Sequence, residues 1–137
     1  MVQIAPGVYF LISVKCGKTL AIDDNGGVCT TNNRVAAGWE GIKIESSPEA
    51  GVYFLSRNKS NGGIVLAIDD GGKVTHTHNR VARGWEGFKI ESAGNGVYFL
   101  IRNKDNRHVL ACDQNGTICT TTNKVANGWE GWRLERA

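Results

Sequence analysis

The sequence predicts an all-β fold in which one four-stranded unit occurs three times. Two motifs and a tryptophan recur in the same order along the 137 residues. The motif GVYFL occurs at residues 7–11, 51–55 and 96–100. The motif LAIDD, or LACDQ in the last copy, starts at Leu20, Leu66 and Leu110. A tryptophan follows each of these leucines after 19 residues, at Trp39, Trp85 and Trp129.

The repeats stay in register over most of their length. Thirteen of the 26 positions from Leu20 to Glu45 are identical in all three copies, which is far more than chance would produce. Between GVYFL and the tryptophan, insertions are confined to the loop that precedes LAIDD. We therefore treat the chain as a single domain, 1–137, with repeats 7–50, 51–95 and 96–137.

Each repeat has the pattern of four short strands. GVYFLI is rich in β-forming residues, TLAID and GIKIES alternate apolar with polar residues, and VCT follows the glycine turn DDNGG. Alternation with period two between Asn, Asp and Gly turns is typical of half-buried antiparallel strands. No segment has helical periodicity of useful length.

Twelve strands in three units favour one closed architecture. A propeller normally has four or more blades, and an open twelve-stranded sheet would leave edges that aggregate. Three four-stranded units that close into a barrel with a hairpin cap form a β-trefoil, with pseudo-three-fold symmetry. This is the fold that we predict.

The repeated apolar residues around the tryptophans are predicted to build the core. Large aromatic side chains dominate core energetics, so we expect Trp39, Trp85 and Trp129 to be buried. The next layer is expected to contain Ile42, Phe88 and Trp132. A further layer would be made by Val35, Val81 and Val125. Tight turns that exclude a Cβ are expected at Gly38, Gly84 and Gly128.

Composition narrows the function. The chain has 16 basic and 13 acidic residues, a formal charge of +3, with no run of lysines or arginines. Nucleic-acid readers usually carry a basic stripe, so a nucleic-acid partner is not expected. There is no basic and apolar leader at the start and no apolar run long enough for a bilayer. We expect a protein that does not insert into membranes and is either cytoplasmic or secreted without a leader.

The four cysteines are expected to be free thiols. Cys16, Cys29, Cys112 and Cys119 lack metal-site spacing. Cys29 and Cys119 occupy equivalent positions in two repeats, where three-fold symmetry keeps them apart. Cys112 replaces Ile22 and Ile68, so it should lie in the core. Free thiols fit a reducing compartment.

The segments around the tryptophans resemble the fascin-type β-trefoil. They read NNRVAAGWEGIKIE, HNRVARGWEGFKIE and TNKVANGWEGWRLE, and fascin units end in Asn-Arg, a small-residue stretch, Trp-Glu-x-Phe and an apolar strand. The resemblance covers nearly the whole chain and implies actin binding. Basic loop residues would then meet the acidic filament: Arg57, Lys59, Arg102, Lys104 and Arg107.

A second, weaker resemblance is to ricin-B-type lectins, which are also β-trefoils. That family places a sugar-binding aspartate after an apolar strand and an asparagine before the closing Gln-x-Trp. The matching aspartates here are Asp23, Asp69 and Asp113. The matching asparagines are Asn33, Asn79 and Asn123. The Gln-x-Trp motif and the paired cysteines of the family are missing from this chain. The resemblance implies binding to glycans of glycoproteins or glycolipids.

The same residues also have a purely structural interpretation. A carboxylate and an amide can grip neighbouring sugar hydroxyls, but Asp and Asn are also the commonest turn formers. Thr31, Thr77 and Thr121 would suit either role. In the middle repeat His76 and His78 should share one strand face beside Asn79. This repeat therefore has more candidate polar ligand-binding residues than the other two. A His-x-His pair could hold zinc only with a third ligand, and none is evident, so no metal or cofactor is predicted.

Three functions remain open. No nucleophile elbow, phosphate loop or His/Cys dyad is present, and adjacent acids in a turn cannot flank a glycosidic bond, so the chain is not expected to be an enzyme. We rank first a carbohydrate-binding lectin with up to three sites. The alternative is a fascin-like actin-binding or bundling module, where bundling needs two filament sites or a homodimer. The third is a trefoil in which every repeated residue serves the fold or a protein partner.

Overall fold

The computed structural model describes residues 4–61 and 63–137, and it contains twelve strands and one 3₁₀ turn. The first repeat contributes β1 (Gly7–Ser13), β2 (Thr19–Ile22), β3 (Val28–Thr31) and β4 (Ile42–Ser46). The second contributes β5 (Val52–Arg57), the turn η1 (Asn58–Ser60), β6 (Val65–Ile68), β7 (Val74–Thr77) and β8 (Phe88–Gly94). The third contributes β9 (Val97–Arg102), β10 (Val109–Cys112), β11 (Ile118–Thr121) and β12 (Trp132–Arg136).

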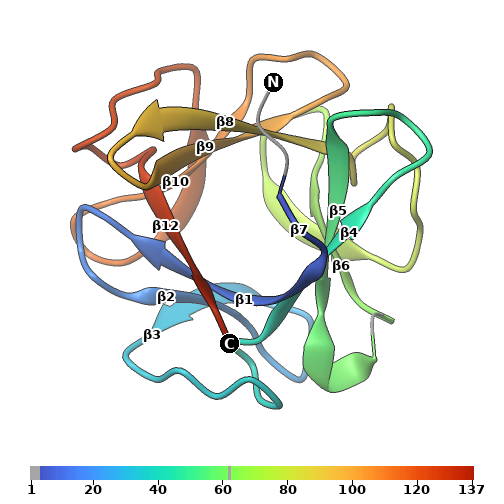
Figure 1. Ribbon diagram of the computed structural model, residues 1–137, viewed down its shortest axis with the longest axis horizontal. Coiled ribbons are helices and arrows are strands. Elements are labelled where there is room, and N and C mark those ends of the chain that lie inside the picture. Colours follow the sequence, from blue (N-terminus) through green and yellow to red (C-terminus); the bar gives the residue numbers. More distant parts are fainter. Residues whose placement is uncertain (1–3, 62) are drawn as a thin grey trace.

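Six of the strands close a barrel. Antiparallel pairing runs from β1 to β4, β5, β8, β9 and β12, and β12 pairs again with β1. The other six strands form three hairpins, β2–β3, β6–β7 and β10–β11. The second strands of these hairpins contact one another at one end of the barrel, and Figure 1 shows the units arranged around a central axis. The predicted β-trefoil of twelve strands is confirmed.

The core is built from equivalent residues of the three repeats. The first core strands contribute Leu11, Leu55 and Leu100, all fully buried. The hairpins contribute Leu20 and Ile22 with their counterparts, among which Cys112 is fully buried at the predicted isoleucine position. Ile42, Phe88 and Trp132 are also fully buried, as predicted. Trp132 Nε1 donates to the Leu110 carbonyl at 2.9 Å, which satisfies the one polar atom of this buried indole.

The prediction that Trp39, Trp85 and Trp129 are core residues is wrong. Each is 37% exposed. The physical reason is that each tryptophan belongs to a turn and not to a strand. Its carbonyl oxygen accepts a hydrogen bond from the backbone of the preceding hairpin, as Trp39 does from Ile22 N at 3.0 Å, and the side chain stays outside the barrel. The residue three positions on takes the core place instead.

The valine layer is also wrong. Val35, Val81 and Val125 are 51%, 52% and 53% exposed. Each valine carbonyl accepts from the amide of the glycine three residues later, for example Val35 O from Gly38 N at 2.9 Å. A Cβ on Gly38 would lie 3.1 Å from the Val35 side chain. The glycine therefore permits the tight turn as expected, but the turn presents its valine to solvent.

Candidate functional site

The three loops with the sequence GWEG form a repeated exposed surface. We call residues 35–41, 81–87 and 125–131 the GWEG loops. Within the described part of the chain, the exposed large hydrophobic side chains are the valine and tryptophan of each loop: Val35, Trp39, Val81, Trp85, Val125 and Trp129. An isolated exposed apolar side chain needs no explanation, whereas the same exposed pair in three copies does.

A buried carboxylate holds each GWEG loop against its hairpin. Glu40 is only 4% exposed, and its carboxylate accepts a hydrogen bond from Thr31 Oγ1 at 2.7 Å. Thr77 with Glu86 and Thr121 with Glu130 repeat this contact at 2.7 Å. The same threonine oxygen accepts from the backbone of the asparagine two residues later. This pairing explains why the threonine and the glutamate recur in all three repeats.

The second glycine of each loop is required by a close backbone approach. A Cβ on Gly41 would lie 1.9 Å from the carbonyl oxygen of Ala36, and Gly87 has the same relation to Ala82. At Gly131 the corresponding distance, to the oxygen of Ala126, is 2.0 Å. No side chain fits at such a distance, so the loop folds back on itself and holds its tryptophan in a fixed place.

The following repeat clamps the first GWEG loop. Asn58 donates from its backbone to Gly41 O at 2.9 Å and from its side chain to Ala36 O at 2.8 Å. Lys59 Nζ lies 2.8 Å from the carboxylate of Asp24. The hydrogen bond from Lys59 is the chief reason that the pKa of Asp24 is lowered. The first GWEG loop is thus held by η1 of the next repeat, and η1 is itself paired with the turn of the first repeat that contains Asp24.

A buried arginine completes this clamp. Arg57 is 6% exposed and donates from Nη1 to the carbonyls of Ile22 and Asp23, at 3.0 and 2.8 Å. The same atom lies 3.1 Å from Asp24 Oδ1, and Nη2 donates to Ser60 Oγ. A buried guanidinium needs such partners because an unpaired buried charge is costly.

The second GWEG loop is clamped in the same way by the third repeat. Asn103 donates to Gly87 O and Ala82 O, at 2.8 and 2.9 Å. Arg102 reaches the carbonyls of Ile68 and Asp69 and the carboxylate of Asp70. Lys104 Nζ also contacts Asp70, at 2.7 Å. The triplet Arg-Asn-Lys therefore has one role in both repeats, to join a repeat to the one before it.

The third GWEG loop lacks this clamp. The equivalent triplet in the first repeat is Ser13, Val14 and Lys15. The Val14 backbone still donates to Gly131 O at 3.0 Å, but a valine has no amide to offer the Ala126 carbonyl. The three GWEG loops are alike in backbone, and two of them are held by additional side chains.

The predicted aspartates shape the hairpin turns. Asp23 Oδ1 accepts hydrogen bonds from the backbone amides of Asn25 and Gly27, at 2.9 and 2.8 Å. Asp69 and Asp113 make the same two contacts in their own turns. One carboxylate oxygen of each aspartate is thus engaged in an Asx turn.

The predicted asparagines lie at the opposite end of the hairpin. In the β2–β3 register Ile22 faces Val28 and Thr19 faces Thr31, so Asp23 lies at the turn and Asn33 follows the open end. Asp69 with Asn79 and Asp113 with Asn123 have the same relation. The structure therefore does not bring the aspartate and the asparagine of one hairpin together. All three asparagines are exposed.

The two histidines of the middle repeat lie on one face of β7 and just beyond it. Their ring centroids are 5.9 Å apart in an edge-on arrangement. His78 Nδ1 lies 2.7 Å from the Gly63 carbonyl. The His76 ring fills the space beside Gly26, where a Cβ would lie 2.2 Å from Cε1. Within residues 4–61 and 63–137 no three side chains of the metal-ligating types gather into a site.

His76 lies where the other two repeats have a threonine. Thr30 Oγ1 donates to Gly116 O at 2.6 Å, and Thr120 Oγ1 donates to Gly72 O at 2.5 Å. These contacts join neighbouring hairpins at the cap, and His76 takes the third place against Gly26. The ring is half-buried and has a packing role in the cap.

The basic residues predicted to meet actin are largely engaged within the molecule. Arg57 and Arg102 are buried at 6% and 3% exposure, so the expectation that they meet a filament is wrong for these two. They are buried because their guanidinium groups satisfy carbonyl oxygens of the preceding repeat. Lys59 and Lys104 pair with Asp24 and Asp70.

The repeated basic residue after each asparagine has a structural partner in the preceding repeat around the axis. Arg80 lies 2.9 Å from Glu45, Lys124 lies 3.2 Å from Glu91, and Arg34 lies 3.3 Å from Glu135. Exposed ion pairs of this kind contribute little to stability. They do explain why the Asn-Arg or Asn-Lys pair recurs.

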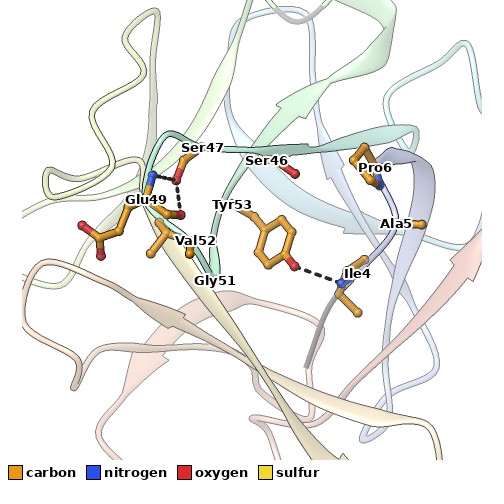
Figure 2. Close-up of a pocket in the computed structure, with 10 residues that line it drawn as sticks. Ile4, Ala5, Pro6, Ser46, Ser47, Glu49, Gly51, Val52 and Tyr53 are labelled. Atoms are coloured by element: carbon orange, nitrogen blue, oxygen red, sulfur yellow. Dashed lines mark hydrogen bonds between the residues drawn. The ribbon is translucent and has the colours of Figure 1, made fainter. Parts of the chain in front are cut away.

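A concave pocket of about 530 Å³ lies at the other end of the barrel, away from the hairpin cap. Figure 2 shows it between the N-terminal segment and the β4–β5 turn, where Ile4 N donates to Tyr53 Oη at 2.9 Å. Its lining residues are Ile4, Ala5, Pro6, Ser46, Ser47, Glu49, Ala50, Gly51, Val52 and Tyr53. None of the predicted site residues is among them, and the pocket involves one repeat junction only.

Solved structures match this fold, although no protein-family model and no curated protein sequence matches the chain. A designed 3-fold symmetric protein, ThreeFoil, is similar with a TM-score of 0.79 and 15% identity, covering 96% of this chain and 99% of that chain. The fold is a β-trefoil. A structure of SeviL bound to asialo-GM1 saccharide is similar with a TM-score of 0.80 and 14% identity, over 97% of this chain and 99% of that chain. The β-trefoil is thus shared with a protein that binds a saccharide. Within the described residues of this β-trefoil, no helix has the length and apolar character needed to cross a bilayer.

Proposed function

We propose that the protein is a carbohydrate-binding lectin with up to three related sites, one at each GWEG loop. The observation that carries the proposal is the exposed tryptophan and valine pair, held in the same place in all three repeats. A buried Glu–Thr contact and an obligatory glycine fix each loop. Each tryptophan keeps 37% of its surface exposed, and the same exposed apolar pair in three copies favours a ligand-binding role.

The chemistry around the first two GWEG loops suits a sugar. An indole offers an apolar face to the C–H face of a pyranose, and neighbouring carboxylates accept hydrogen bonds from hydroxyls. At the first loop the exposed polar partners are Asp24 and Lys59, and at the second they are Asp70 and Lys104. The ligands would be glycans of glycoproteins or glycolipids, and the protein would act as a binder and not as an enzyme.

The residues predicted from the sequence enter this proposal in two ways. Asp23, Asp69 and Asp113 form the turns that support the loops, and their neighbours Asp24 and Asp70 carry the exposed charge. The asparagines at 33, 79 and 123 and His78 remain exposed polar groups at the open ends of the hairpins. They are candidates for contacts to more distant sugars of an extended glycan.

The likeness to SeviL bound to a saccharide supports the class of ligand through the shared fold alone. Three related sites would also suit a cell surface, because linked weak sites raise the overall avidity. The proposal therefore expects low affinity for a single glycan and stronger binding to a dense glycan layer.

A glycan array tests the proposal. The wild-type protein should bind a defined set of glycans, and the triple variant Trp39→Ala, Trp85→Ala, Trp129→Ala should lose this binding while far-UV circular dichroism shows that it remains folded. Arg133→Ala, an exposed residue on β12 outside the loops, is the matched control and should bind normally. Wild-type protein that is folded yet binds nothing on a broad array would contradict the proposal.

The structure offers less support for the alternative function, an actin-binding module. Two of its five basic residues are buried, and two more are paired within the molecule. Co-sedimentation with filamentous actin at low salt distinguishes the two functions. Pelleting that falls as salt rises, together with a silent glycan array, would favour actin.

A further inference from the structure

The seam between the third and first repeats replaces the arginine clamp with a pair of cysteines. Ser13 stands where the other seams have Arg57 and Arg102. Cys16 stands in the place of Ser60 and Asp105, whose side chains accept hydrogen bonds from those arginines. Cys112 stands in the place of Ile22 and Ile68. Two independent departures from the repeat thus bring two thiols to one junction.

The two sulfur atoms are already in contact. Cys16 Sγ and Cys112 Sγ are 3.2 Å apart, although the residues are 96 positions apart in the chain. Both are free thiols in the structure. A disulfide bond has a length of about 2.05 Å, so a sulfur shift on the order of 1 Å would join them.

The surroundings give the two thiols different reactivities. Burial opposes ionisation of Cys16, but hydrogen bonds from Ser13 and from the Lys18 backbone outweigh it and lower the pKa of this thiol. Burial is the main cause that raises the pKa of Cys112 to about 12. Cys16 is only half-buried, whereas Cys112 is fully buried. A half-buried thiol with a lowered pKa is the one that reacts first with an oxidant.

We propose that Cys16 and Cys112 form a reversible oxidative modification site, at which a peroxide oxidant converts the pair to a disulfide that closes the last seam of the barrel. The Cys16 thiolate attacks one oxygen of hydrogen peroxide, and the O–O bond breaks to give a sulfenic acid and hydroxide, which is protonated to water. The Cys112 sulfur then attacks the Cys16 sulfur, its proton passes to the leaving hydroxyl, and a second water is released. Two thiols lose two electrons in total, and one peroxide accepts them.

The position of the pair gives the modification a structural consequence. The chain itself joins the first repeat to the second through the β4–β5 turn, and the second to the third through the β8–β9 turn. The third and first repeats are joined by non-covalent contacts, which include the pairing of β12 with β1. A bond between Cys16 and Cys112 would link these two repeats covalently and restrict the unfolded chain over a long loop.

The other two cysteines serve as an internal control. Burial is the main cause that raises the pKa of both Cys29 and Cys119, and nearby carboxylates add to it. Neither makes a contact with another sulfur among the described residues. Oxidation at the seam should therefore precede any change at these positions.

The test is differential alkylation after mild oxidation. Reduced protein is freed of dithiothreitol, treated with hydrogen peroxide, alkylated and analysed by intact-mass and peptide mass spectrometry. We expect two of the four thiols to become protected, a mass decrease of about 2 Da before alkylation, and a linked peptide pair that contains Cys16 and Cys112. Dithiothreitol should restore all four thiols. The oxidised protein should melt on the order of 10 °C higher.

Variants that restore the repeat sequence give matched controls. Cys16→Ser copies Ser60 and Cys112→Ile copies Ile22 and Ile68, and each should abolish the protection and the rise in melting temperature. Cys29→Thr and Cys119→Thr copy Thr75 and should leave both intact. If Cys112→Ile does not fold, Cys16→Ser still decides the matter at a half-buried site. The proposal is overturned if all four thiols stay reactive, if Cys29 or Cys119 forms the bond, or if the linked protein melts no higher than the reduced one.

Discussion

The clamped seams and the cysteine seam solve the same packing problem with different chemistry. At the first two seams a buried arginine donates hydrogen bonds to two backbone carbonyls of the preceding repeat and pairs with an aspartate of that repeat. At the third, the small side chain of Ser13 leaves room for two sulfur atoms in contact. The backbone pairing is the same at all three, since Val14, Asn58 and Asn103 each donate to a glycine carbonyl. The barrel therefore requires a filled and satisfied junction, and it accepts either ion pairs or thiols there.

Replacement of the buried arginine at either of the first two seams should cause the largest loss of stability. Arg102→Ala removes the buried guanidinium from two carbonyls, Asp70 and Asp105, and breaking a buried pair costs about 3 kcal/mol of unfolding free energy or more. Arg57→Ala should cost about 2 kcal/mol, because its second partner is the neutral Ser60. Urea denaturation measures both.

Ser13→Ala is the matched change at the cysteine seam. It should cost less than about 1 kcal/mol, because no charge is left unpaired. A loss as large as that of Arg102→Ala would contradict the view that only two seams depend on ion pairs.

The next largest effect should be a difference between the seams in how their contribution to stability depends on pH. Burial alone would raise the pKa of Asp105, but hydrogen bonds from Arg102, from the Arg107 backbone and from His108 outweigh it and hold the pKa far below its usual range. A depressed pKa stabilises the folded state above the unfolded value near pH 4. This stabilisation is lost as the pH falls below that value toward the folded pKa.

The variant Asp105→Asn should therefore be about 2 kcal/mol less stable than wild type at pH 6, and the difference should shrink between pH 4 and pH 2. Urea denaturation at several pH values measures it. Cys16→Ser, at the equivalent position, should differ from wild type by the same amount at every pH in this range. A difference for Asp105→Asn that does not depend on pH would show that the carboxylate contributes no charge interaction.

The sequence predicted the architecture well because the repeats carry it redundantly. Alternation and turn residues identified all twelve strands, and the layer of Ile42, Phe88 and Trp132 is buried as expected. The tryptophans were assigned to the core wrongly, because residue type alone does not say whether a turn residue points inward. A sequence signal did exist, since the glutamate after each tryptophan lies nine residues from a repeated threonine, a spacing that suits a loop folded back on its hairpin.

The contacts between repeats were harder to predict from sequence. The roles of Arg57 and Arg102 depend on partners about 33 residues away in the preceding repeat, and the Cys16–Cys112 contact spans 96. Local patterns do not report such separations. The repeated Arg-Asn-Lys triplet, with Ser-Val-Lys in the first repeat, was the one visible trace of them.

Restoration of the missing asparagine should strengthen the third seam slightly. Val14→Asn supplies an amide that can donate to Ala126 O, as Asn58 and Asn103 do to Ala36 and Ala82. One added hydrogen bond should stabilise the fold by about 0.5 to 1 kcal/mol and raise the melting temperature by roughly 2 to 4 °C. Calorimetry measures this shift, and a lower melting temperature would contradict the equivalence of the three positions.

The smallest expected effect links the seams to the proposed function. The first two GWEG loops are held by an asparagine of the next repeat, and the third is not, so the third site is less preorganised. Trp39→Ala and Trp85→Ala should each reduce glycan binding about three times as much as Trp129→Ala does. Surface plasmon resonance on an immobilised glycan measures the ratio. A larger loss from Trp129→Ala would reverse the ranking of the sites.

Whether glycans bind at the GWEG loops is tested most directly by NMR. The four indole N–H signals of the protein are followed during titration with a glycan selected on an array. Three of these indoles are exposed in the GWEG loops, and the fourth, Trp132, is fully buried with its N–H bonded to Leu110. We predict that the signals of Trp39, Trp85 and Trp129 shift as the glycan is added, while that of Trp132 does not. Glycan binding that leaves all three exposed indoles unshifted would contradict this prediction.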